Sequence, residues 1–182
     1  MSHPPQLTDV ATLRRQAREH IERGAVTAGY SADREQVLKL LNEALATELV
    51  CVLRYRRHHF MASGIHGKSV GAEFLVHSNE EQGHADMLAA RIVQLGGEPD
   101  FSPGSLLERS HAEYVAGDTL GQMIRENLVA ERIAIDSYRD VISYLGDQDA
   151  TTSVLLKKIL AVEEEHADEL ADLLNNIPTQ PA

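Results

Sequence analysis

Two short stretches of the sequence carry the same pair of potential metal ligands. The stretch 79–86 reads NEEQGHAD and the stretch 162–168 reads VEEEHAD, so each contains Glu-x-x-His followed by Ala-Asp. The pairs are Glu81 with His84 and Glu163 with His166. Carboxylates and imidazoles both bind divalent first-row metals. Because helix positions i and i+3 are neighbours on one face, both side chains of a pair can reach the same ion.

A lone glutamate precedes each pair at almost the same distance. Glu48 lies 33 residues before Glu81, and Glu131 lies 32 residues before Glu163. Steps of three or four residues place all four glutamates in the middle of otherwise apolar helical stripes. Ionised glutamates in a core are costly unless a cation pairs with them. Four carboxylates and two imidazoles that face one another suit two iron or manganese ions.

A solvent-exposed charged face is the simpler reading of a single Glu-x-x-His pair. Glu164 and Glu165 follow Glu163 directly and do suggest such a face. However, two copies with lone glutamates at matched offsets, all on apolar stripes, are hard to obtain by chance. The sequence therefore favours a di-metal site inside a helical bundle.

Several other side chains lie near these positions. Tyr55 follows Glu48 by seven residues on the same face, where it can hydrogen-bond a ligand, supply an electron or simply pack in the core. His77 lies one turn before Glu81, and we expect it to pack or to face a neighbouring subunit, with lining the site as the alternative. We predict that His58 and His59 lie at the surface, and that Asp86 and Asp168 lie at the surface or at a helix contact. We expect Cys51 to be a small buried residue.

The composition is that of a helical globular protein. Of the 182 residues, 43% are hydrophobic and 25% charged, which suits one domain with a sizeable core. The single cysteine allows no internal disulfide, and the N-terminus has no apolar run typical of a signal peptide. We therefore expect a cytoplasmic protein without a membrane span. The net charge of −11 disfavours binding to nucleic acid and is compatible with attracting cations.

The hydrophobic periodicity predicts an all-α protein: a four-helix bundle with one long crossover between two antiparallel hairpins. An N-terminal extension (1–30) with an amphipathic helix precedes the bundle (31–175), and a flexible tail (176–182) follows it. Ser31 is the expected N-cap of the first long helix. The predicted helices are 6–23, 32–61, 70–95, a short one within 105–114, 120–145 and 154–174.

The segment 33–174 resembles the bacterioferritins. The runs that carry the resemblance are LNEALATELVCVLRYRRHH, EQGHADMLAARIVQLGGEPDF, MIRENLVAERIAIDSYRDVI and ILAVEEEHADEL. It implies a ferroxidase and iron store that binds two iron ions per chain, for which manganese or zinc can substitute. Dioxygen or hydrogen peroxide would be the oxidant. All six ligand positions match, and the resemblance makes Glu81 and Glu163 the bridging carboxylates.

Three departures point to the Dps-like mini-ferritin branch. Bacterioferritins carry a haem-ligating methionine where this chain has Gln82, so we expect no haem. They also continue into a fifth helix, whereas here only sixteen residues follow His166, with Pro178 and Pro181 among them. The N-terminal extension is additional. Together these features predict a homo-oligomeric shell of twelve chains.

Two other functions share parts of this pattern. A rubrerythrin-like peroxidase would use the same di-iron bundle without storing iron, but the single cysteine excludes the rubredoxin-type cluster of that family. A DNA-protecting Dps-type protein usually needs a lysine-rich tail. In the N-terminal extension, Arg14, Arg15, Arg18 and Arg23 are offset by Asp9, Glu19 and Glu22, so DNA binding is disfavoured.

Overall fold

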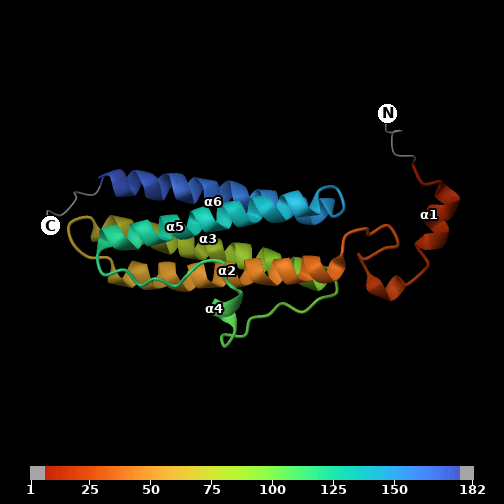
Figure 1. The fold of residues 1–182 in the computed structure, drawn as a ribbon, viewed down its shortest axis with the longest axis horizontal. Coiled ribbons are helices and arrows are strands. Elements are labelled where there is room, and N and C mark those ends of the chain that lie inside the picture. Colours follow the sequence, from red (N-terminus) through yellow and green to blue (C-terminus); the bar gives the residue numbers. More distant parts are fainter. Residues whose placement is uncertain (1–6, 177–182) are drawn as a thin grey trace.

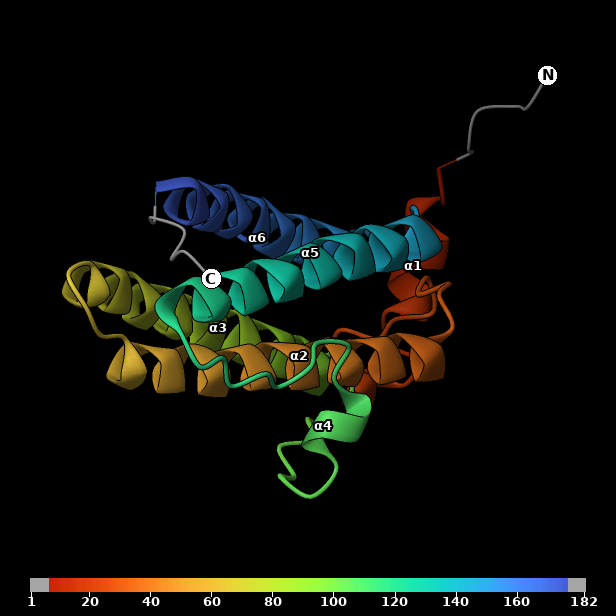
Figure 2. The same ribbon diagram turned by 60° about the vertical axis from the view of Figure 1, so that its left-hand side comes forward.

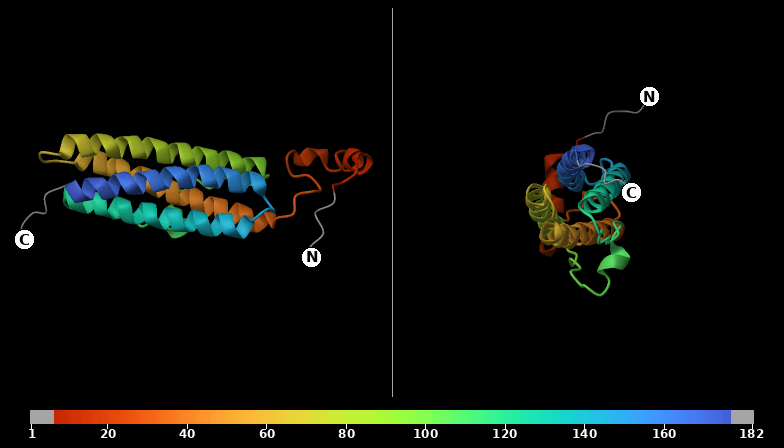
Figure 3. Two further views of the ribbon diagram at one scale, coloured as in Figure 1. Left: turned by 90° about the horizontal axis from the view of Figure 1, so that it is seen from above. Right: turned by 90° about the vertical axis from the view of Figure 1, so that its left-hand side faces the viewer.

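Four long helices run side by side in the computed structural model, which describes residues 7–176 (Figure 1). They are α2 (Arg34–Met61), α3 (Gly67–Gln94), α5 (Leu120–Leu145) and α6 (Ala150–Asn176). Short turns join α2 to α3 and α5 to α6, and the end view shows the four helices around a common centre (Figure 3). Residues 7–176 contain no β-strand, which confirms the all-α bundle with one crossover. None of their helices is long and apolar enough to cross a membrane.

The crossover between α3 and α5 lies along α2 and contains the short helix α4 (Leu106–Arg109) (Figure 2). Polar side chains of α2 hold it in place. Arg54 is buried and donates to the carbonyl oxygen of Glu113 at 2.8 Å and to Asn127 Oδ1 at 2.9 Å. These bonds compensate the burial of its charge. Because the crossover covers this face of α2, the segment also shields residues that periodicity alone would leave in solvent.

His58 is the clearest case, and its predicted surface position is wrong. It is fully buried under the crossover, with Nε2 2.8 Å from the carbonyl oxygen of Ala116 and Nδ1 3.1 Å from Asn127 Oδ1. His59 is only partly buried, and its Nδ1 lies 2.7 Å from the carbonyl oxygen of Gly71. A helix pattern cannot show that a distant loop will cover one of its polar faces.

The helix ends differ from the predicted ones for local reasons. The N-cap of α2 is Asp33, not Ser31, because the Asp33 carboxylate accepts from the backbone N–H of Gln36 at 3.2 Å. Helix α3 begins at Gly67 rather than at residue 70: a Cβ at this position would lie 3.0 Å from the Ala62 backbone, so glycine permits the tight turn. Helix α6 begins four residues early, where Asp149 accepts from the backbone N–H of Thr152 at 2.9 Å.

The described part of the N-terminal extension, from residue 7, lies beyond one end of the bundle (Figure 1, Figure 3). The helix predicted within the amphipathic stretch from about residue 6 to 23 is present but shorter than the stretch. Helix α1 covers only Val10–Gln16, and a 3₁₀ turn, η1 (Ile21–Arg23), follows after His20, whose φ of 51° is left-handed. Residue 6 and most of the predicted tail, from 177 to 182, fall outside the described residues. No side chain of α1 is buried against the bundle.

The apolar core has two parts that lie on either side of a polar middle layer. One part packs residues such as Leu41, Leu88 and Ile159, and the other packs residues such as Phe74, Ile124 and Leu170. Cys51 belongs to the second part, is buried and is not in a disulfide, as predicted. The two apolar parts hold the helices in register. The layer between them therefore has a fixed geometry.

Candidate metal centre

The polar middle layer contains all six side chains that the sequence singled out. Each comes from the middle of a long helix, and none is more than 4% exposed to solvent. Helix α2 contributes Glu48, α3 contributes Glu81 and His84, α5 contributes Glu131, and α6 contributes Glu163 and His166. The structure therefore brings the six predicted side chains from four helices together at one place.

The six side chains form two groups, and each group has the composition of a metal site. In each group, one ligand atom per residue lies within 4.8 Å of every other ligand atom. Two carboxylates, those of Glu81 and Glu163, belong to both groups. The groups are Glu48, Glu81, His84 and Glu163, and Glu81, Glu131, Glu163 and His166. Two adjacent ions that share two carboxylates would fit this arrangement.

The two histidines lie among the carboxylates. His84 Nδ1 lies 2.8 Å from Glu163, 3.1 Å from Glu81 and 3.5 Å from Glu48. Burial lowers the pKa of His84, but the contacts with Glu163, Glu48 and Glu81 outweigh burial and raise it above its ordinary value. Burial also lowers the pKa of His166, but contacts with Glu163 and Glu81 outweigh burial and raise it. His166 Nδ1 lies 3.3 Å from Glu81. Without metal, two imidazolium ions therefore supply positive charge to the site.

These two cations do not satisfy the four carboxylates. Burial and the charges of neighbouring glutamates raise the pKa of Glu48 and of Glu131 well above the ordinary value. Close contacts with the imidazoles of His166 and His84 overcome the effect of burial on Glu81 and lower its pKa. Every one of the four carboxylates keeps at least one buried oxygen without a hydrogen bond. Such orphaned oxygens are costly, and two divalent cations would satisfy them.

Two tyrosines hold the lone glutamates in a crossed pattern. Tyr55 of α2 donates its hydroxyl proton to Glu131 of α5, and Tyr138 of α5 donates to Glu48 of α2. Burial, followed by the adjacent carboxylates, raises the pKa of both phenols well above the ordinary value. Both therefore stay protonated donors. Such outer hydrogen bonds orient carboxylate ligands toward a metal.

Tyr138 is the site residue that the sequence reading missed. The signal was nevertheless present: Tyr138 follows Glu131 by seven residues, as Tyr55 follows Glu48. Seven residues are close to two helical turns, so each tyrosine lies on the same face as its own glutamate and faces the glutamate of the other hairpin.

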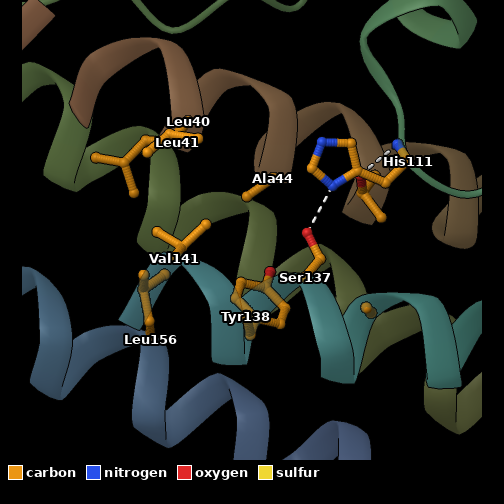
Figure 4. Close-up of a pocket in the computed structure, with 10 residues that line it drawn as sticks. Leu40, Leu41, Ala44, His111, Ser137, Tyr138, Val141 and Leu156 are labelled. Carbon is orange, nitrogen blue, oxygen red and sulfur yellow. Dashed lines mark hydrogen bonds between the residues drawn. The ribbon is translucent and has the colours of Figure 1, made fainter. Parts of the chain in front are cut away.

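An apolar pocket lies beside Tyr138, on the side away from α3 (Figure 4). Leu41 and Ala44 of α2 and Val141 of α5 contribute to its wall. At its rim, His111 of the crossover pairs with Ser137, their Nδ1 and Oγ atoms 2.6 Å apart. No carboxylate lines this pocket, and its His111 and Tyr138 side chains are already bonded, to Ser137 and to Glu48 respectively.

The opposite side of the centre is polar. His166 Nε2 lies 2.9 Å from Glu80, which orients the ring so that Nδ1 faces the centre. His77 is buried and stacks on His166 with ring centroids 4.0 Å apart, so it packs beside the site. Asp86 and Asp168 are exposed, as predicted.

Fold and site together define a helical-bundle protein with a carboxylate–histidine cluster at its centre. A family model described as a ferritin-like domain matches residues 38–179, and the chain belongs to this family. A bacterioferritin of Mycobacterium leprae is 34% identical over 136 residues, which cover 74% of this chain and 80% of that protein. The family is the one that the sequence resemblance predicted.

Solved structures with the same fold include two proteins from other bacteria. The first is a dodecameric thioferritin, a bacterioferritin-related protein of Bacteroides fragilis: 30% identity, TM-score 0.77, covering 80% of this chain and 88% of that one. The second is Dps of Thermosynechococcus elongatus: 25% identity, TM-score 0.74, covering 77% and 90%. The structural likeness therefore extends to both branches that the sequence suggested.

Proposed function

We propose that this protein is an iron-storage ferroxidase that binds two Fe²⁺ ions per chain as substrate. The observation that carries this proposal is the pair of buried ligand groups that share Glu81 and Glu163. In this assignment Glu48 and His84 bind one ion, Glu131 and His166 bind the other, and the shared carboxylates bridge them. A cation at each position would satisfy the orphaned oxygens.

The residues support oxidation by stabilising the product charge. Each Fe²⁺ gives up one electron, and hydrogen peroxide takes both electrons and two protons to become two water molecules. With dioxygen, the same two electrons and two protons yield hydrogen peroxide. Anionic carboxylates favour Fe³⁺ over Fe²⁺, because they stabilise the ion of higher charge more strongly. His84 and His166 must release their protons before they can bind the ions.

Storage also requires a closed shell, and we propose one of twelve chains. The described surface leaves large apolar side chains exposed, among them Leu53, Phe60 and Ile65. Helix α1 likewise exposes Val10 and Leu13 and makes no buried contact with its own bundle. Contacts between copies of the chain would cover these surfaces. The dodecameric thioferritin of Bacteroides fragilis, with its similar bundle, supports this size.

Particle mass and iron content, measured together, test the proposal. Twelve chains of 20.1 kDa give about 240 kDa and twenty-four give about 480 kDa. We expect the smaller particle, loaded after aerobic Fe²⁺ addition with far more iron than two ions per chain. A particle that never exceeds two ions per chain would favour the peroxidase without storage, and a stable monomer or dimer would contradict storage. Initial rates with peroxide and with dioxygen identify the oxidant.

A further inference from the structure

His77 lies between the proposed centre and the solvent-facing side of α3 and α6. Its side chain is 1% exposed. Nδ1 lies 3.2 Å from the Tyr55 hydroxyl, whereas Nε2 lies 2.8 Å from Glu169 of α6 and 3.8 Å from Glu73 of α3. The two carboxylates are 40% and 44% exposed, so the outer end of this cluster is open to water.

The hydrogen-bond partners decide which nitrogen of His77 carries a proton. Tyr55 has one hydroxyl proton, and it donates that proton to Glu131. His77 must then donate from Nδ1 to the Tyr55 oxygen. In a neutral ring, Nε2 presents its lone pair, and this lone pair faces the carboxylates of Glu169 and Glu73. A divalent cation at this point would be bound by the Nε2 lone pair and by both carboxylates.

We propose that Glu73, His77 and Glu169 bind a third divalent metal ion, separate from the six-residue centre. One ligand atom from each residue lies within 4.8 Å of the other two. Glu73 and His77 are one helical turn apart on α3, and Glu169 completes the set from α6. One imidazole and two carboxylates suit Fe²⁺, Mn²⁺ or Zn²⁺, with water in the remaining positions.

The position of this ion gives it a role in metal transfer, and that role, unlike the site itself, rests on the proposed function. His77 stacks on His166, and His77, Glu80 and His166 form a further group whose ligand atoms converge. An ion that enters between the exposed carboxylates therefore has ligands at each stage from the α3/α6 face to the centre. The His77–Tyr55–Glu131 hydrogen bonds connect the third site directly to one ligand of the centre.

Zinc titration of the full-length protein tests the third site, because Zn²⁺ binds such ligands without being oxidised. We expect metal-free protein to bind three Zn²⁺ per chain at micromolar concentration. The double variant Glu73→Gln/Glu169→Gln changes only half-exposed side chains and should bind two. The matched control Asp168→Asn removes a neighbouring exposed carboxylate of α6 and should still bind three. In Zn²⁺-soaked crystals, an anomalous peak should lie about 2.1 Å from His77 Nε2.

Two results would overturn the third site: equal Zn²⁺ stoichiometry in the wild type and the double variant, or the absence of an anomalous peak at His77. The variant Glu48→Gln/Glu131→Gln separates this proposal from the proposed function. It should lose the ions of the centre but keep the ion at His77. If wild-type protein binds Zn²⁺ at His77 but none among the six central residues, the third site stands and the ferroxidase centre fails. If wild-type protein binds Zn²⁺ among the six central residues but none at His77, only the third site is rejected.

Discussion

The two halves of the centre have matching ligands but different surroundings. In one half, Tyr55 donates to Glu131 and is itself in contact with His77. In the other half, Tyr138 donates to Glu48 and borders an apolar pocket (Figure 4). A pseudo-twofold arrangement of four helices explains the matching ligands. The surroundings differ because the half with His77 faces the carboxylates of α3 and α6, whereas no carboxylate lines the pocket beside Tyr138. Under the proposed function, Fe²⁺ would enter from the carboxylate side.

Removal of a ligand should have the largest effect on activity. We expect Glu131→Ala to slow initial Fe²⁺ oxidation by about 100-fold or more, since even outer partners of metal ligands contribute 10- to 100-fold. The helical content should remain. Stability of the metal-free protein should stay the same or increase, because one buried carboxylate is gone. Stopped-flow absorbance measures the oxidation. Asp140→Ala, an exposed acid on the same helix, is the control and should retain the wild-type rate. Unchanged initial oxidation in Glu131→Ala would remove this residue from the site.

The two tyrosines provide the direct comparison of the halves. Tyr55→Phe and Tyr138→Phe each leave one carboxylate without its donor, and each should weaken metal binding or slow oxidation by about 10- to 100-fold. We expect the larger effect from Tyr55→Phe, because it also frees His77 Nδ1 from its partner. Fe²⁺ affinity under anaerobic conditions and the initial oxidation rate should both be measured. If the two variants have equal effects, the contact between Tyr55 and His77 contributes nothing to metal binding or oxidation.

A smaller effect should appear in the pH dependence of stability. The pKa of His84 is raised in the folded metal-free protein, and that of His166 is raised to about 11. A raised histidine pKa stabilises the fold fully below the unfolded value of 6.5, and this stabilisation is lost as pH rises toward the folded value. The raised pKa values of Glu48 and Glu131 act in the same direction. Glu81, whose pKa is lowered, stays ionised throughout this range.

The melting temperature of metal-free protein should therefore fall between about pH 6.5 and 9.5. In Zn²⁺-loaded protein the ions replace the imidazolium protons, so the decrease should be smaller. Calorimetry on both forms makes the comparison. A melting temperature of the metal-free protein that rises across this range would contradict the assigned protonation.

We expect neither half of the centre to bind haem. Gln82 and Glu164 follow the shared glutamates directly, and neither offers a thioether. Gln82 is instead bonded to Asp86 through its amide nitrogen, at 3.0 Å. Protein made with excess haem should show no Soret band, and a band with bis-methionine character would prove this wrong.

The sequence predicted the bundle and its six converging residues because both follow from one periodicity. A glutamate that lies in register with the apolar residues of its helix must face the core. The positions of Glu48, Glu81, Glu131 and Glu163 in the core could therefore be predicted without coordinates. The burial of His58 could not be predicted from the sequence, because it depends on where the crossover lies. The contacts of His77 also depend on the pairing of α3 with α6. The first residues of α3 and α6, Gly67 and Ala150, are determined by the geometry of the preceding turns, which hydrophobic periodicity does not predict.

Anomalous diffraction from crystals soaked anaerobically in Fe²⁺ tests the di-metal assignment most directly. Besides an ion at His77, we predict two iron peaks in the centre, one in each four-residue group. They should lie about 3.5 to 4 Å apart, with Glu81 and Glu163 both in contact with both ions. A single central peak, or iron bound only on the surface while the six residues keep their metal-free hydrogen bonds, would contradict the assignment.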